Sequence, residues 1–133
     1  MQPAARQWQR IVQARLGHHK VSSACIAPLL LIGRSGGGLR QVELAQQLGV
    51  EGPSLVRLLD KLAELGLVRR ENHASDRRAK QIWLTDEGQR LHEELEHALA
   101  DLRHEVLAEM SEDELRAVLK FYRLLGDSSA RIA

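Results

Sequence analysis

Two basic segments of this chain carry side chains whose types and spacing could do chemistry. The first is the amphipathic run at residues 52–62, which presents Arg57 and Lys61. The second is a polar tip at residues 76–80, which lies between two short β-like runs and carries Arg77, Arg78 and Lys80. Guanidinium and ammonium groups donate hydrogen bonds to anions. A helix followed at once by a basic hairpin is one way in which a protein reads one groove of DNA and reaches into the next.

Charge is distributed unevenly along the chain, although the net formal charge is only +1. Residues 1–80 hold 13 Lys and Arg against 6 Asp and Glu, whereas residues 86–114 hold 2 against 11. This asymmetry predicts a polyanion-binding surface in the first part and a different use for the second. The alternative is a pair of differently solvated faces, and charge alone does not decide between the two.

Length and composition indicate one globular domain. Of the 133 residues, 44% are hydrophobic and 28% charged, which suffices for a buried core. The longest nearly apolar run, residues 25–33, is too short to span a bilayer, so we expect no membrane partner. The first residues do not resemble a secretory signal, and the single cysteine, Cys25, cannot form an intrachain disulfide. These features predict a cytoplasmic location.

The elements that position the basic segments follow from apolar spacing, glycine and proline. Residues 41–49 predict a short helix that ends at Gly49, and Pro53 occupies a favoured first-turn position of the next helix. Two helices joined by such a turn form a helix-turn-helix. We expect the first helix to turn a core face inward, made of Val42, Leu44, Ala45 and Leu48. The second, ending at Gly66, should bury the stripe Leu55, Leu58, Leu59, Leu62 and Leu65 and expose Arg57, Asp60, Lys61 and Glu64, with Ser54 at the margin.

A hairpin is expected after that helix. Residues 67–71 and 81–85 are short and β-rich enough to pair as strands. The polar connection between them, residues 72–80, is long for a hairpin turn and is typical of a projecting element.

Helices are predicted on both sides of this unit. Residues 5–16 have helical apolar spacing and end at Gly17, and a second helix begins at Ser22 or Ser23. Pro28 within that second helix predicts a late start or a kink. Later in the chain Thr85 caps a long helix with the stripe Leu91, Leu95, Leu99, Leu102 and Val106. The run Ser111-Glu112-Asp113-Glu114 is a capping box that begins a last helix through Leu115, Val118, Leu119, Tyr122 and Leu125.

These features resemble the MarR family of winged helix-turn-helix transcription regulators, and within it the SlyA-like branch. The resemblance extends over roughly residues 8–125 in helix order. It is carried by Glu-Leu-Ala-Gln-Gln-Leu-Gly-Val-Glu-Gly-Pro-Ser-Leu-Val-Arg at 43–57, Leu-Asp-Lys-Leu at 59–62, Leu-Gly-Leu-Val-Arg-Arg at 65–70, Ala-Ser-Asp-Arg-Arg-Ala-Lys at 74–80 and Leu-Thr at 84–85. A helix-turn-helix alone is a weak signal, and the basic wing at its usual distance makes it specific.

The resemblance implies a mainly α fold with a small β-hairpin wing, a winged helix-turn-helix with N- and C-terminal dimerisation helices. Residues 1–133 form a single domain, in which 41–85 are the DNA-binding core and 5–35 and 86–126 supply helices for the core and for dimerisation. The implied function is a ligand-responsive repressor that binds a pseudo-palindromic operator in double-stranded DNA as a homodimer. The dimerisation residues are Trp8, Ile11, Val12, Leu115, Leu119 and Tyr122.

The resemblance also implies a role for each basic residue. Pro53 and Ser54 lie at the start of the recognition helix, and Arg57 reads a base or contacts a phosphate one turn further on. Lys61 contacts a phosphate. In the wing, Arg78 enters the minor groove and Asp76 holds the orientation of that arginine. Arg77 and Lys80 contact phosphates.

The chain departs from the family pattern at two informative positions. Arg40 stands where members often have a capping Ser or Thr, which predicts a weaker cap on the helix that follows. Ile26 stands where SlyA-like relatives often have an aromatic residue near the effector pocket. The aromatic-carboxylate effectors of relatives therefore do not carry over, and the identity of a small-molecule effector stays open.

Several other residues could form sites. His97, Asp101 and His104 share one helical face and could bind a metal with His92, His18 or His19, but an exposed face of an acidic helix is the more economical explanation. Cys25 could sense oxidation or be an inert buried thiol, and Trp8 and Trp83 fit a core better than stacking platforms.

No catalytic constellation is visible in the sequence. Residues 36–38 are three glycines, but the Gly-Lys-Ser/Thr of a phosphate loop does not follow them. We therefore expect neither an enzyme nor a cofactor. The rival to a DNA-binding protein is a winged-helix module that binds another protein without specific DNA binding.

Overall fold

The computed structural model describes the backbone of residues 2–17, 21–73 and 76–132; the side chains of Ser23, His73 and residues 76–79 lie outside the description. These residues form six helices and three strands. The chain divides into two compact units, residues 1–102 and 103–133. The helices are α1 (Gln2–Leu16), α2 (Ser23–Arg34), α3 (Gln41–Leu48), α4 (Gly52–Glu64), α5 (Asp86–Val106) and α6 (Glu112–Ile132). The strands are β1 (Leu39–Arg40), β2 (Val68–His73) and β3 (Asp76–Leu84). The mainly α class with a small β wing is confirmed.

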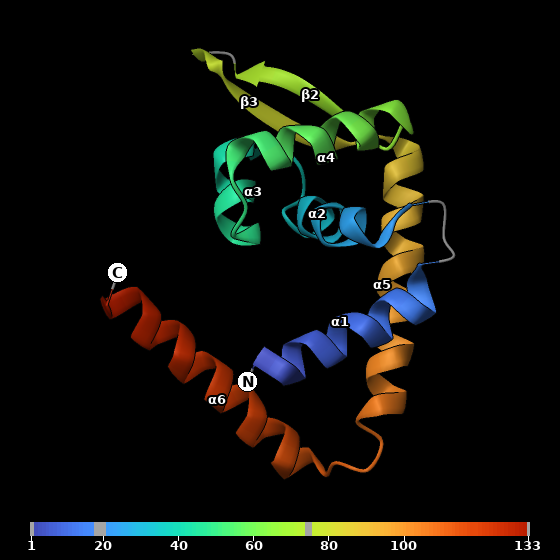
Figure 1. Cartoon of the computed structure of the whole chain (residues 1–133), viewed down its shortest axis with the longest axis vertical. Coiled ribbons are helices and arrows are strands. Elements are labelled where there is room, and N and C mark those ends of the chain that lie inside the picture. The colour runs from blue at the N-terminus through green and yellow to red at the C-terminus, as the bar shows by residue number, and fades with distance from the viewer. Residues whose placement is uncertain (1, 18–20, 74–75, 133) are drawn as a thin grey trace. The chain divides into compact units, whose positions relative to one another are not determined.

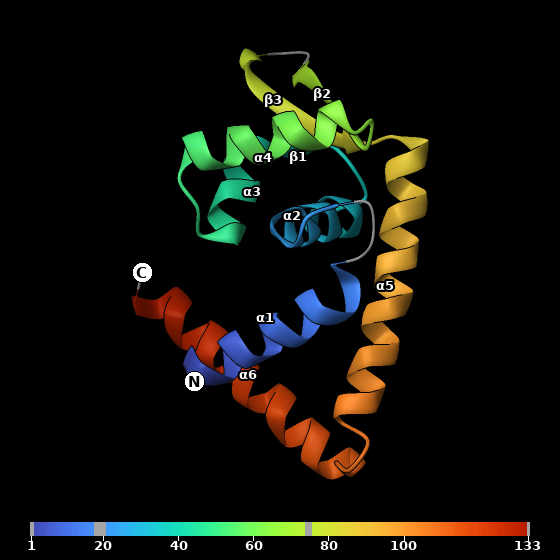
Figure 2. The same cartoon turned by 45° about the vertical axis from the view of Figure 1, so that its right-hand side comes forward.

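The core of the first unit is built around α2. In both views α4 lies over α2, the β2–β3 hairpin lies beyond α4, and the first part of α5 runs along one side (Figures 1 and 2). Burial of apolar surface from all these elements stabilises the unit. The fully or nearly fully buried side chains include Leu29 and Ile32 of α2, Leu44 of α3, Leu55, Leu59 and Leu62 of α4, Ile82 of β3 and Leu95 of α5.

Helix α2 runs from Ser23 to Arg34 with Pro28 inside it, so the expected late start is wrong, and the kink given as its alternative stays a prediction. Ser22 occupies the N-cap position but makes no side-chain capping bond; its hydroxyl lies 3.6 Å from the Cys25 sulfur. Proline removes one helical hydrogen bond at a cost of about 3 kcal/mol. Here the Pro28 side chain is fully buried, and its packing in the core offsets that cost.

The hairpin strands are longer than the sequence predicts. The two strands pair in antiparallel register from Val68↔Leu84 to His73↔Asp76, with an irregularity between Asn72 and His73. Most of the predicted connection at residues 72–80 is therefore paired strand, because backbone groups form an antiparallel ladder even where both side-chain faces are polar. The sequence also missed β1, which pairs with β3 through Leu39↔Ile82 and gives the order β1-β3-β2.

A glycine turn joins α3 to α4, and a threonine cap joins the sheet to α5. Gly49 takes the left-handed conformation (φ 67°) after α3, as predicted. Thr85 caps α5, because its Oγ1 accepts the Gly88 N–H at 3.0 Å and donates to the Gly66 carbonyl at 2.6 Å. A Cβ at Gly88 would lie 2.0 Å from the Leu67 carbonyl oxygen, so only glycine lets α5 begin this close to β2.

Some residues assigned to core stripes are exposed instead. Val42 in the first turn of α3 is 64% exposed, and Leu65, which follows the last residue of α4, is 40% exposed. Leu58 is half-buried, and Val106 at the end of α5 is exposed. These residues lie at helix ends or at the margin of a stripe, where the helix turns away from its neighbours. The stripe Leu91, Leu95, Leu99 and Leu102 is buried as expected.

The second unit contains α6, which continues to Ile132, beyond the predicted end near Leu125. No residue of α6 is buried in the single chain. Large apolar side chains are exposed along it at Val118, Leu119, Phe121, Tyr122, Leu124, Leu125 and Ile132. No helix in the described part of the chain is long and apolar enough to cross a membrane.

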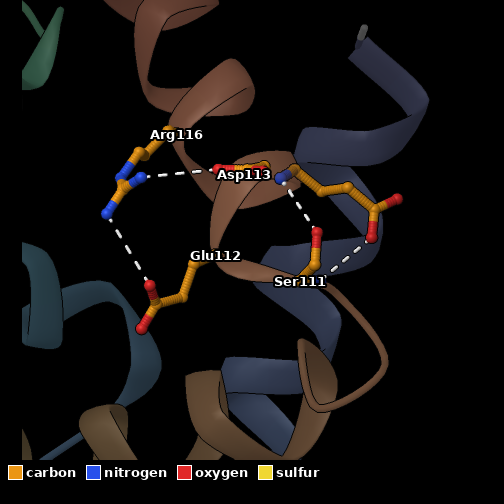
Figure 3. Close-up of polar contacts among 5 residues, drawn as sticks. Ser111, Glu112, Asp113 and Arg116 are labelled. Atoms are coloured by element: carbon orange, nitrogen blue, oxygen red, sulfur yellow. Dashed lines mark hydrogen bonds and ion pairs between the residues drawn. The ribbon is translucent and has the colours of Figure 1, made fainter.

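The capping box that begins α6 is confirmed. The backbone N–H of Ser111 donates to Glu114 Oε1 at 2.9 Å, and the Glu114 N–H donates to Ser111 Oγ at 3.2 Å. Figure 3 shows Ser111 at this turn, with Arg116 reaching back to Glu112 and Asp113. The Ser111 N–H favours the charged carboxylate, so the pKa of Glu114 lies below its ordinary value of 4.5.

This lowered pKa predicts a pH response of the first turn of α6. Stabilisation by a group with a depressed pKa is present above its unfolded value of 4.5 and is lost as the pH falls through the folded value. Amide hydrogen exchange at residues 112–115 should therefore quicken, beyond the intrinsic pH effect, only at pH values below 4.5. Glu114→Gln keeps an acceptor that does not titrate and should show a smaller response. Identical pH profiles in the two proteins would contradict this account.

Candidate nucleic-acid interface

Helix α4 has two opposite faces. Leu55, Leu59 and Leu62 are 0% exposed and fix the inner face against the core. The outer face carries the four predicted major-groove residues, all of which are exposed: Pro53, Ser54, Arg57 and Lys61. Residues three and four positions apart lie on one side of a helix, so the structure brings the last three of these into one row.

The cations of this outer face form no ion pair with the described residues. Pro53 lies in the first turn, where its missing N–H costs nothing. Among the described residues, no carboxylate forms an ion pair with Arg57 or Lys61. Both side chains are exposed, so within the described part of the chain these cations are available to an external anion.

The hairpin supplies the second basic element, beyond α4 (Figure 1). Lys80 is exposed and pairs across the ladder with Asn72. By strand alternation Lys80 lies on the same side of β3 as buried Ile82. The side chains of Asp76, Arg77 and Arg78 lie outside the described residues, so their assigned roles stay predictions.

An ion pair that sequence reasoning missed joins the two basic elements. Arg70 Nη1 of β2 lies 2.8 Å from Asp60 Oδ1 of α4, with side chains 28% and 52% exposed. The sequence places Asp60 only on the polar side of α4, and Arg70 only in a strand. Their opposite charges on either side of the Gly66 turn are the signal that could have found the pair. It holds the base of the hairpin to the outer side of α4.

The expected weak cap of α3 is confirmed. Arg40 is the N-cap residue and makes no side-chain capping bond. Its Nε instead donates to Glu43 Oε1 at 2.6 Å, a pair within the first turn. The first helix of the motif therefore depends on burial of Leu44 rather than on its cap.

A hollow lies in the first unit among α1, α2 and α5. Its volume is about 440 Å³, and its lining is mainly apolar: Trp8, Val12, Ala24, Ile26, Ala27, Leu30 and Leu99, with the amides of Gln9 and Gln13. Trp8 and Val12 are half-buried and pack against the core of their own chain. Ile11 is 36% exposed. The predicted dimerisation residues of α1 thus divide between the hollow and the surface.

The other predicted sites are not brought together. His97, Asp101 and His104 are exposed, and the described residues contain no group of three His, Cys, Asp or Glu that could hold a metal. His18 and His19 lie outside the described residues. Cys25 is fully buried.

His92 is buried against α2. A Cβ at Gly33 would lie 2.3 Å from its Nδ1, which has no hydrogen-bond partner among the described residues. One turn further along α5, Glu96 Oε1 pairs with Arg34 Nη2 of α2 at 2.8 Å. His92 therefore serves helix packing in this structure.

Known proteins share both the sequence pattern and the fold. A family model described as the MarR family matches residues 19–79. The transcriptional regulator PA3341 is 39% identical, with a TM-score of 0.86 over 96% of this chain and 94% of that chain. A structure of MarR is 26% identical, with a TM-score of 0.82 over 96% of this chain and 86% of that chain. A mutant MarR from E. coli complexed with operator DNA is 23% identical and shares the fold, with a TM-score of 0.79 over 93% of this chain and 89% of that chain.

The Asp60–Arg70 pair predicts measurable coupling between α4 and β2. In a double-mutant cycle with Asp60→Asn and Arg70→Gln, the coupling in the free energy of unfolding should reach up to about 1 kcal/mol. Urea unfolding measures it. The control cycle uses Arg69 and Glu71, which lie on the same strand at 3.3 Å and whose side chains are 59% and 52% exposed. A coupling no larger than that of the control pair would show that Asp60 and Arg70 do not join the two elements.

Proposed function

Because the chain belongs to the MarR family of winged-helix transcription regulators, we propose that it binds a pseudo-palindromic operator as a homodimer and represses from it. The observation that carries this proposal is the outer face of α4. There Ser54, Arg57 and Lys61 form an exposed row whose two cations have no carboxylate partner among the described residues, beside a hairpin held to the same helix. In addition, a protein of the same fold is known in complex with operator DNA.

In this proposal α4 enters the major groove and reads bases through its N-terminal half. The fork of Arg57 can donate to O6 and N7 of one guanine together, which contributes roughly 1–3 kcal/mol of discrimination. Pro53 and Ser54 lie closest to the base edges at the start of the helix. Lys61 lies one turn beyond Arg57 and contacts a phosphate, which fixes the register of the helix on the duplex.

The wing reaches the adjacent minor groove. Arg78 enters it, where narrow A·T-rich DNA concentrates negative potential, and Asp76 holds the arginine in place. Arg77 and Lys80 contact phosphates on either side. The exposure of Lys80 supports its part in this proposal.

The terminal helices form the dimer. None of the apolar side chains of α6 is buried in the single chain, and burying them against a second copy is the favourable way to remove them from water. Tyr122 and Leu119 are 62% and 67% exposed and belong to this apolar set. Leu115, Trp8, Ile11 and Val12 extend the interface. A two-fold dimer then presents two copies of α4 to half-sites about one helical turn apart.

A small ligand regulates the dimer. The hollow among α1, α2 and α5 lies between the helix at the centre of the DNA-binding unit and a helix assigned to dimerisation. A molecule that fills it would shift α1 relative to α2, and a dimer with a fixed half-site distance is sensitive to such a shift. The lining is apolar with two amides, so the effector is uncharged over most of its surface. Membership of the SlyA-like branch and a cytoplasmic location belong to the same proposal.

Arg57→Ala tests the reading role of α4. With the DNA duplex that wild-type protein selects from a random pool, the variant should bind about 5- to 150-fold more weakly, which is the affinity equivalent of one bidentate contact. It should also accept substitutions at one base pair of each half-site. Arg90→Ala, an exposed arginine on α5, is the matched control and should bind as wild type does.

Gel-shift titrations at several salt concentrations provide the measurement. Wild-type affinity should fall steeply with salt as counterions compete. Equal affinity of wild type and Arg57→Ala at moderate salt would rule out this role of α4. A salt-insensitive protein that binds no duplex specifically would favour the protein-binding alternative.

Leu119→Glu tests the dimer. A buried, unpaired carboxylate would disfavour the interface, so the variant should sediment as a monomer of about 14.9 kDa and the wild type at twice that mass. Lys120→Glu, an exposed neighbour on the polar side of α6, should remain dimeric. A Leu119→Glu protein with wild-type mass would show that this face does not form the interface.

A further inference from the structure

The indole of Trp83 lies at the base of the hairpin, against the backbone that leads into β1. A Cβ at Gly37 would lie 2.4 Å from Trp83 Cε3, and one at Gly38 would lie 3.1 Å from Cζ2. The first distance is shorter than a side chain allows, and the second would require the ring to shift by a few tenths of an ångström. The ring therefore lies directly on the backbone of these two glycines, and nothing larger can occupy Gly37 without moving it.

The glycine segment is itself held to β3. Gly37 and Gly38 have φ values of 102° and 72°, a backbone region that favours glycine. The Gly38 N–H donates to the Ile82 carbonyl at 3.1 Å, and Gln81 Nε2 donates to the Gly38 carbonyl at 3.3 Å. The segment thus forms a strap across the end of β3 on which the indole rests.

Arg69 lies over the same ring. Arg69 and Trp83 are directly opposite in the antiparallel register, so their side chains share one face of the sheet. The guanidinium carbon lies 5.7 Å from the ring centroid, within the range of a cation–π contact. Arg69 Nε also pairs with Glu71 Oε1 at 3.3 Å, which holds the guanidinium along β2. The indole therefore joins three segments: the glycine strap, β2 and β3.

The position of this contact matters because the hairpin is narrow beyond it. Among the described residues, β1 pairs with β3 only at Ile82 and Gln81. From Lys80 toward its tip, the hairpin therefore has two strands. Its ladder is also irregular between Asn72 and His73. A two-stranded ribbon is only marginally stable and does not hold its own direction well. Its direction must be set at its base.

The indole N–H has no role in this contact. Trp83 Nε1 is buried and has no hydrogen-bond partner among the described residues. The flat ring, and not its polar group, is what fits between the strap and Arg69. A phenyl ring should therefore preserve the function of Trp83, whereas an aliphatic side chain should not.

We propose that Trp83 is a positioning residue of the wing: its indole, seated on Gly37 and Gly38 and covered by Arg69, fixes the direction of the hairpin relative to α4. The proposal rests on the proposed DNA binding, to which it adds a separate determinant. Loss of this seat leaves α4 in the major groove and releases the wing from the minor groove. Loss of the seat therefore removes the minor-groove contacts and keeps the major-groove contacts.

Gly37→Ala and Trp83→Ala test the proposal with the duplex that wild-type protein selects from a random DNA pool. Hydroxyl-radical footprinting reports the minor groove, and methylation protection of guanine N7 reports the major groove. Both variants should lose minor-groove protection and bind at least 10-fold more weakly, an order-of-magnitude loss in the range of wing contacts. Both should keep methylation protection and dimer mass.

Two variants serve as controls. Gly36→Ala carries the same positive-φ strain (φ 80°) but would place its Cβ in open space, so it should keep both protections. Trp83→Phe should restore the minor-groove protection that Trp83→Ala loses. Trp83→Leu keeps apolar volume without a flat ring and replaces Trp83→Ala if that protein fails to fold.

Each outcome decides between the role of Trp83 and the proposed function. Wild-type protein that selects no duplex overturns the proposed function before any variant is made. If wild type binds and Gly37→Ala keeps minor-groove protection, only the role of Trp83 is overturned. Parallel loss of both protections, or failure of Trp83→Phe to restore the wing contact, would mean that the residue merely stabilises the fold.

Discussion

Burial of one leucine stripe of α4 is the interaction on which the rest of the structure depends. Leu55, Leu59 and Leu62 have no exposed surface, so α4 can lie on the core in only one rotational setting. That setting determines which side chains face outward, and it places Arg57 and Lys61 there. The pattern that stabilises the fold therefore also decides which cations are available to a polyanion.

Several contacts join α4 and α5 to the hairpin at the base of the wing. Asp60 pairs with Arg70, Thr85 bonds to the Gly66 carbonyl, and Gly88 lies against Leu67. By contrast, α6 leaves its apolar side chains exposed. The first unit thus contains both basic elements of the candidate DNA-binding surface. The second unit exposes an apolar helix face that needs a partner, which we propose to be a second copy.

The sequence predicted what is local and missed what is paired at a distance. The Gly49 turn, the Ser111 capping box and the α4 stripe are readable because each depends on residues within one or two turns. Strand β1 is only two residues long and is defined by a partner more than forty positions away. Pro28 inside α2 and the Trp83 seat depend on packing in three dimensions, and the Asp60–Arg70 pair on the turn between them. No spacing rule contains the packing information, whereas the opposite charges on either side of the Gly66 turn are a signal for the ion pair.

Sequence selection from a random DNA pool with the purified full chain tests the central claim most directly, since the protein itself identifies the duplex that it binds. The account predicts enrichment of a pseudo-palindrome whose two half-sites are about one helical turn apart, with a preferred guanine in each half-site. Enrichment of no sequence, or of a single unpaired half-site, would contradict the claim that two copies of α4 read DNA together.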